Sequence, residues 1–124
     1  DRLRANITAM ATGPIPLRPH VKTHKIPEIA RRQLAAGATG LTVATLGEAE
    51  IFADVCDDIF IAYCLWPDEG QAERLAALSR RVRLTVIEEQ RRRLLGLRER
   101  RAYSSAALTA ELAKLDAEEI SLTL

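Results

Sequence analysis

The chain contains few aromatic residues and no strong excess of charge of either sign. Phe, Trp and Tyr make up 4% of the 124 residues, and the formal net charge is +1. Such a balance gives no global attraction to nucleic acid or to a membrane surface. No apolar run approaches the roughly 20 residues that a membrane-spanning helix needs, and no signal peptide is visible. We therefore expect a cytoplasmic protein.

Cysteine is scarce as well, since only Cys56 and Cys64 occur. Both sit in apolar surroundings and lack the spacing of metal ligands. We expect buried free thiols in a reducing compartment, with a disulfide or a reactive thiol as the alternatives. Ala, Leu and Arg are abundant instead, which favours helix.

Strand and helix patterns alternate up to residue 87. The strand patterns recur about every 20 residues, which is the rhythm of βα units with a parallel sheet. Four units make half of an eight-stranded barrel, and a complete barrel needs about 250 residues. We predict an α/β fold, a partial (half) TIM-type βα barrel with parallel strands, or else a small open sheet. The predicted strands are 17–22, 40–45, 58–65 and 82–87, and the predicted helices are 2–11, 27–36, 46–55 and 68–81.

Local signals refine three of these elements. Pro27 stands at the first turn of its helix and Gly37 closes it. Thr45 is a candidate N-cap of the next helix, with Glu48 completing a capping box. The 58–65 stretch, DIFIAYCL, is almost continuously apolar, as expected for a strand buried on both faces, and Asp58 at its start is expected to be solvated.

The alternation stops after residue 87, where we place a domain boundary. Residues 88–124 predict a helical tail with helices at 88–101 and 105–115, an N-cap at Ser104 or Ser105, and ISLTL at 120–124 as a candidate strand. Arginines cluster in this tail, which favours nucleic-acid binding. Residues 88–124 nevertheless contain seven basic and seven acidic residues, so a solvated charged helix is the simpler interpretation. The clustered arginines are Arg91, Arg92, Arg93, Arg98, Arg100 and Arg101.

The segment LRPHVKTHK, residues 17–25, contains an arginine, two histidines and two lysines. Side chains alternate along a strand, so Arg18, His20 and Lys22 would share one face and apolar residues the other. In a barrel the apolar face meets the helices and the basic face points inward. Unpaired charge there is costly, so the basic face would need an anionic or electrophilic partner. A solvated edge strand is the alternative.

Three segments in order, RPHVKTHK, TVATLGEAE and IAYCLWP, resemble the N-terminal barrel region of fold-type III pyridoxal-phosphate enzymes. The chain is most similar to their D-threonine aldolase and D-serine dehydratase branch, in the alanine racemase superfamily, over residues 1–87. The resemblance implies pyridoxal 5'-phosphate as cofactor and a D-amino acid as substrate. It makes Lys22, at the end of the first strand, the catalytic lysine that holds the cofactor as a Schiff base. Lys25 lies beyond the strand and is the weaker candidate.

Five further residues are candidates to contact the cofactor. Arg18 and His20 would supply positive charge that favours the unprotonated amine of Lys22, with structural roles as the alternatives. His24, Thr45 and Tyr63 stand at strand ends, where βα loops form barrel active sites. For Thr45 the alternative is the N-cap, and for Tyr63 it is core packing.

The resemblance ends near Val86. The later strands, whose loops hold the cofactor phosphate in this family, and the divalent-metal ligands of the aldolase and dehydratase branch do not occur in this sequence. We therefore expect a fragment of a pyridoxal-phosphate-dependent D-amino acid lyase that is inactive alone, holds no metal and could form a homodimer. The alternatives are a non-catalytic remnant and a regulatory protein with a nucleic-acid-binding tail.

Overall fold

The computed structural model describes residues 2–63, 67–100 and 103–124. The chain divides into two compact units, Asp1–Leu75 and Ala76–Leu124. No helix within the described ranges is both long enough and apolar enough to cross a membrane.

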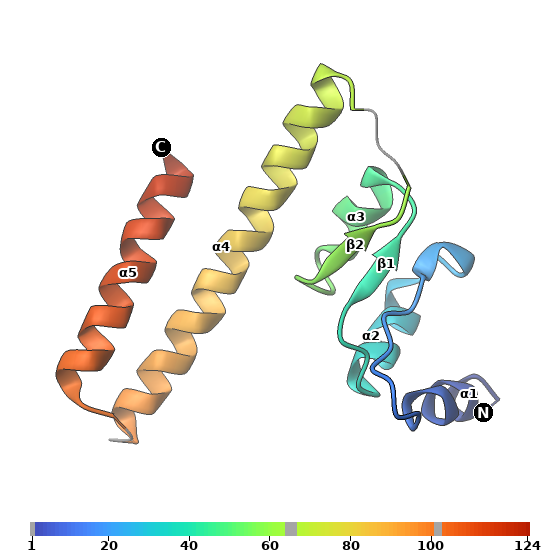
Figure 1. The fold of residues 1–124 in the computed structure, drawn as a ribbon, viewed down its shortest axis with the longest axis horizontal. Coiled ribbons are helices and arrows are strands. Elements are labelled where there is room, and N and C mark those ends of the chain that lie inside the picture. The colour runs from blue at the N-terminus through green and yellow to red at the C-terminus, as the bar shows by residue number, and fades with distance from the viewer. Residues whose placement is uncertain (1, 64–66, 101–102) are drawn as a thin grey trace. The chain divides into compact units, whose positions relative to one another are not determined.

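The first unit contains a small parallel sheet. β1 (Leu41–Val43) pairs with β2 (Ile59–Ile61), with Thr42 opposite Phe60, and α3 (Leu46–Phe52) connects the two strands (Figure 1). The mixed α/β class and the parallel pairing are confirmed. Among the described residues the sheet has two strands, so a barrel is not formed by them.

The first predicted strand, 17–22, is wrong as a regular strand, because these residues contain one isolated bridge and no strand element. Residues 17–20 do run beside β1, because the Thr39 and Thr42 amides donate to the carbonyls of Leu17 and Pro19, both at 2.9 Å. His20 then forms a single parallel bridge with Thr42. A 3₁₀ turn, η1 (Val21–Thr23), follows in place of further strand. The imidazole of His20 accepts the Lys22 amide, and such a local bond competes with a sheet ladder.

The core of this unit lies on the helix side of the sheet. Alternate residues of β1 are buried, and Phe52 of α3 is 1% exposed. The expectation that 58–65 is buried on both faces is wrong, since Phe60 is 59% exposed. A two-stranded sheet with helices on one side leaves its other side open to solvent. The buried apolar residues of this unit are Val21, Ala30, Leu41, Val43, Ala44, Leu46, Ala49 and Phe52.

The helices of the first unit follow their sequence signals. α1 (Arg2–Ala11) matches its prediction, and α2 (Pro27–Ala35) begins at Pro27. Gly37 follows α2 with φ of 107°, a conformation that glycine adopts without the steric cost of a Cβ. Thr45 caps α3, since its side chain accepts the Glu48 amide.

The fourth predicted strand, 82–87, is wrong. One helix, α4 (Glu69–Glu99), runs through it, so the boundary expected near residue 87 lies inside a helix. The alternation of VRLTVI resembles a strand, but no Gly or Pro occurs from residue 71 to 95 and strong helix formers stand on both sides. Helix propagation is cooperative, so flanking helix carries a short β-branched stretch with it.

The second unit contains the rest of α4 and α5 (Ser105–Thr123), which turns back beside α4 (Figure 1). Ser104 is the N-cap, and its hydroxyl oxygen accepts the Ala107 amide. The candidate strand at 120–124 is wrong, because α5 continues to Thr123. Ion pairs join the two helices: Arg83 to Glu118, and Arg91 to both Asp116 and Glu119.

Candidate functional site

Lys22 lies at the end of the extended segment that runs beside β1. Parallel strands bring their carboxyl ends to one edge, which is where βα folds place ligands. The ammonium nitrogen is 5.5 Å from the centre of the Tyr63 ring, beyond the end of β2. Lys22 is exposed, and Tyr63 is 57% exposed. Tyr63 is therefore not part of the core, and it lies beside the predicted catalytic lysine.

Both histidines of the segment hold the backbone around Lys22. His20 Nδ1 accepts the Lys22 amide at 3.3 Å, and His24 Nδ1 accepts the Ile26 amide at 3.0 Å. An imidazole that accepts through Nδ1 carries its proton on Nε2. Each ring therefore binds the backbone of the turn through Nδ1. In His24 the other ring nitrogen, Nε2, is buried and has no hydrogen-bond partner among the described residues.

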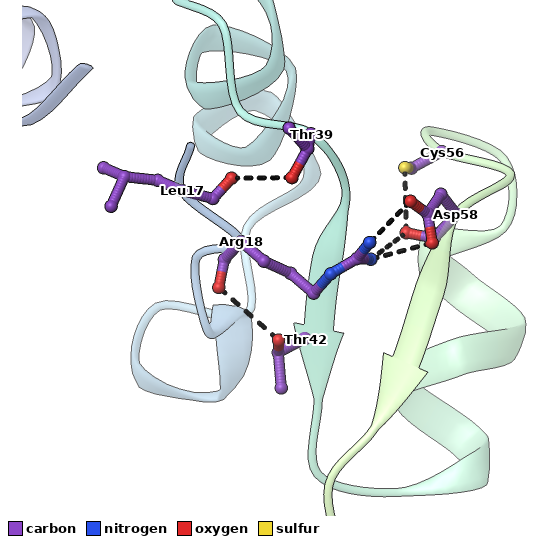
Figure 2. A network of polar contacts seen from close by, with 6 residues as sticks. All are labelled: Leu17, Arg18, Thr39, Thr42, Cys56 and Asp58. Carbon is purple, nitrogen blue, oxygen red and sulfur yellow. Dashed lines mark hydrogen bonds and ion pairs between the residues drawn. The ribbon is translucent and has the colours of Figure 1, made fainter. Parts of the chain in front are cut away.

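Arg18 forms an ion pair with Asp58. Its guanidinium reaches Asp58 at the start of β2, with Nη1 and Nη2 donating to the two carboxylate oxygens at 2.8 and 2.6 Å (Figure 2). The bidentate pair lowers the pKa of Asp58. Asp58 is exposed but paired, which corrects the expectation of a merely solvated carboxylate.

This pair lies at the amino-terminal edge of the sheet, opposite the edge at which the strands end. The carbonyls of Leu17 and Arg18 also accept the hydroxyls of Thr39 and Thr42 in the same network (Figure 2). Arg18 therefore fastens the segment to the sheet. The expectation that it supplies positive charge beside Lys22 is not met by this geometry.

Glu48 is the one charged residue among the described residues that is buried, at 8% exposure. Its Oε2 accepts the Ala44 amide at 2.7 Å and its Oε1 lies 3.1 Å from the ammonium of Lys25. The Ala44 hydrogen bond and then the Lys25 contact lower the pKa of Glu48 against the opposing effect of burial. One carboxylate thus joins the turn after the first extended segment to the end of β1. Sequence reasoning assigned Glu48 only to the cap of α3.

Thr45 serves that cap. Its exposed side chain accepts the Glu48 amide through Oγ1 at 3.2 Å, which agrees with the structural alternative for this residue. The hydroxyl proton remains able to donate to a further acceptor.

One of the two cysteines, Cys56, lies among the described residues. Cys56 is a free, half-buried thiol whose Sγ donates to the Asp58 carbonyl at 3.3 Å. Burial raises the pKa of this thiol, so it is a poor nucleophile. Cys64 and Trp66 lie outside the described residues. Within the described residues no group of three or more His, Cys, Asp or Glu side chains could hold a metal ion.

Comparison with known proteins finds partial similarity to two enzymes. The chain is 48% identical over 73 residues to D-threo-3-hydroxyaspartate dehydratase of Delftia sp. (strain HT23), covering 54% of this chain and 19% of the enzyme. It is 49% identical over 49 residues to D-threonine aldolase of Arthrobacter sp., covering 36% of this chain and 13% of that enzyme. The chain therefore spans about a fifth or less of the length of these two curated relatives.

A third relative carries no activity in its name. An uncharacterized protein of Mycobacterium tuberculosis is 49% identical over 45 residues, covering 36% of this chain and 26% of that protein. No family model and no solved structure matches the chain. The similarity to D-amino acid lyases is substantial in identity and limited in extent.

Proposed function

We propose that this chain carries the lysine-bearing βα portion of a fold-type III pyridoxal-phosphate lyase that acts on D-amino acids. The proposal combines the partial similarity to two such lyases with one structural observation. The amine of Lys22 is exposed at the edge where the strands end, beside the Tyr63 ring. Among the described residues no carboxylate pairs with it.

The residues around Lys22 fit the aldehyde end of the cofactor. A lysine amine is the group that condenses with an aldehyde, and an aromatic side chain beside it suits a planar ring. The exposed Thr45 hydroxyl, just after β1, keeps a proton that it can donate, whereas His24 Nε2 has no partner among the described residues but is buried. When bound, pyridoxal phosphate would withdraw electrons from the Cα of an amino acid substrate. The residues around Lys22 would position the cofactor and form hydrogen bonds with it.

Lys22 is positioned by a backbone that is held from several sides. The Lys22 amide is fixed by His20, and the carbonyl of Val21 accepts the amides of both His24 and Lys25. Val21 itself is fully buried. A hydrogen-bonded turn that carries an exposed lysine is suited to present an amine to a small molecule.

The test is the absorbance of the purified chain mixed with pyridoxal phosphate, before and after borohydride reduction, followed by peptide mass spectrometry. The chain contains three lysines, Lys22, Lys25 and Lys114. Mass spectrometry of the peptides can therefore assign the label to one of these three side chains. We expect the reduced label mainly on Lys22. Lys22→Ala should remove most of it, whereas the matched change Lys114→Ala, at an exposed helical position, should not.

Equal labelling of the three lysines would contradict the proposal. We expect no turnover of D-threonine or D-serine by this chain alone, and measurable turnover would overturn that expectation. Homodimerisation stays a prediction, which sedimentation of the purified chain tests. A label on Lys22 without turnover is the result expected of a cofactor-binding remnant of such an enzyme.

A further inference from the structure

Two lysines lie three residues apart in the turn that follows the first extended segment, and the structure treats them differently. Lys22 contacts a ring, whereas Lys25 contacts the carboxylate of Glu48. Both side chains are accessible, since Lys22 is an exposed residue and the side chain of Lys25 is 66% exposed. Exposure therefore does not decide which amine meets an aldehyde.

Glu48 holds Lys25 from a buried position. The side chain of Glu48 is 10% exposed, against 66% for Lys25. Its other oxygen is bound to the Ala44 amide, and its own amide is bound to Thr45. The carboxylate is therefore fixed on the framework of β1 and α3, and it cannot follow Lys25 away.

The backbone of Lys25 is fixed as well. Its amide donates to the Val21 carbonyl at 2.8 Å. Its φ of 52° lies in the left-handed region, which few residues other than Gly, Asn and Asp favour. Residue 25 thus ends the turn in a conformation that aims its side chain at Glu48.

Condensation of Lys25 with an aldehyde would undo this contact. The Lys25 ammonium would release one proton to solvent, and its nitrogen would form a C=N bond to the aldehyde carbon while its other two protons leave with the aldehyde oxygen as water. The buried Glu48 carboxylate would then lose its cationic partner, which is costly for a charged group out of water. The same reaction at Lys22 would leave no buried carboxylate unpaired, and the contact it would alter is the one with the exposed Tyr63 ring.

We infer that Glu48 is a specificity-determining residue that directs an aldehyde cofactor to Lys22 by holding Lys25 on a buried carboxylate. The inference rests on the proposed function for the identity of the aldehyde. Glu48 thus has a role beyond its part in the N-cap of α3.

The experiment compares the labelling of the three lysines by pyridoxal phosphate and borohydride in the full chain and in two variants. Lys114, which pairs with Glu111 on the surface of α5, is the internal reference. Glu48→Gln keeps an oxygen for the Ala44 amide but removes the charge that holds Lys25. We expect the ratio of Lys25 to Lys114 label to rise about threefold.

Glu111→Gln is the matched control, because it removes an exposed carboxylate from a lysine in the same way. It should leave the ratio of Lys25 to Lys22 label unchanged. If Glu48→Gln leaves Lys25 labelled no more than in the wild type, the inference is wrong. Circular dichroism checks that each variant is folded.

A second measurement needs no variant and no cofactor. Limited acetylation of the wild-type chain with acetic anhydride should modify Lys25 more slowly than Lys114, although both side chains are mostly exposed. Equal rates would overturn the inference. Slow acetylation of Lys25, together with a pyridoxal-phosphate label on Lys22 that exceeds the label on Lys25 but not that on Lys114, would contradict the proposed function alone.

Discussion

At the scale of single residues, the chain depends on a few polar side chains that join segments distant in sequence. Arg18 reaches Asp58 across 40 residues, and Glu48 reaches Lys25 across the first βα connection. Each lies at one edge of the small sheet, Arg18 at the amino-terminal edge and Glu48 at the carboxyl edge. Substitutions that remove either contact should therefore lower the stability of the fold. Substitutions at the carboxyl edge, near Lys22, should also change ligand binding.

Gly40 is predicted to be required for the Arg18 contact. A Cβ at residue 40 would come within 2.6 Å of the Asp58 carbonyl oxygen and overlap the Arg18 guanidinium. Gly40→Ala should lower the free energy of unfolding by about 1–3 kcal/mol, measured by urea denaturation.

Gly47→Ala is the matched control for Gly40, because nothing lies within 4 Å of a Cβ there and residue 47 is helical. It should leave stability equal or raise it by about 0.5–1 kcal/mol. A loss of the same size at both glycines would contradict the packing argument.

Glu48 should make folding sensitive to acid. The Ala44 amide and the Lys25 ammonium lower the pKa of Glu48 in the folded chain below its ordinary value near 4.5. Its contribution to stability is therefore present above that value and lost as the pH falls through the lower, folded pKa. The free energy of unfolding should fall less steeply between about pH 6 and about pH 3 in Glu48→Gln than in the wild type.

Glu28→Gln serves as the comparison for this pH dependence, since Glu28 forms only exposed helical pairs with Arg31 and Arg32. A Glu48→Gln slope equal to that of Glu28→Gln would exclude Glu48 as a source of acid sensitivity.

At the scale of elements, α3 and α5 each begin at a residue whose side chain caps the helix. Thr45 and Ser104 each accept an amide of the first turn, which satisfies a group that otherwise has no intrahelical partner. Ser104→Ala should lower the stability of α5 by about 1 kcal/mol, measured by thermal unfolding followed at 222 nm.

Ser105 is the neighbouring control for this cap, because it is the first helical residue of α5 and not its N-cap. Ser105→Ala should change stability little or raise it slightly. An equal effect of the two substitutions would mean that Ser104 does not act as the cap.

A substitution at Thr85 tests whether residues 82–87 are helical. The sign of the change in stability distinguishes a helix from a strand. Thr85 is exposed in α4, and alanine is a better helix former than threonine by about 0.5 kcal/mol, so Thr85→Ala should stabilise. In a strand the same change would destabilise, because threonine favours strands. Thr42→Ala on β1 gives the reference for a strand, with a loss of stability.

At the scale of the whole molecule, the chain combines a βα unit with a helical unit, and the basic cluster of the latter is partly neutralised. Arg91 pairs with Asp116 and Glu119, while Arg92 and Arg93 both pair with Glu89. Since nucleic-acid affinity depends on cations that can reach phosphates, we expect no gel shift of duplex DNA even at about 50 mM salt.

Glu89→Gln sharpens this prediction, because it releases Arg92 and Arg93 from their shared carboxylate. If the tail has any affinity for DNA, this variant should bind more tightly than the wild type, and added salt should weaken the binding. A salt-dependent shift by the wild-type chain would favour the nucleic-acid alternative.

Local signals in the sequence predicted much of the first unit. Helices at 2–11 and from Pro27, the cap at Thr45 and the parallel strands near 41 and 59 all follow from short-range rules that act within one turn or one strand. The errors occur where a local pattern was ambiguous. VRLTVI alternates like a strand, and its helical state depends on the long helix-forming stretches around it.

The site shows the same division. The sequence by itself determined that a basic, histidine-rich segment precedes a βα unit, and the resemblance of three segments to a known enzyme family made Lys22 the lysine of interest. Only the tertiary structure decided that Arg18 faces Asp58, that both histidines bind backbone amides, and that Lys25 is held by Glu48. The physical reason is that Arg18 and Asp58 are 40 positions apart and that Lys25 and Glu48 lie in different elements, so strand register and packing define these partners. The histidine contacts span only two residues, but they form because the chain turns at Val21–Thr23 instead of continuing as a strand.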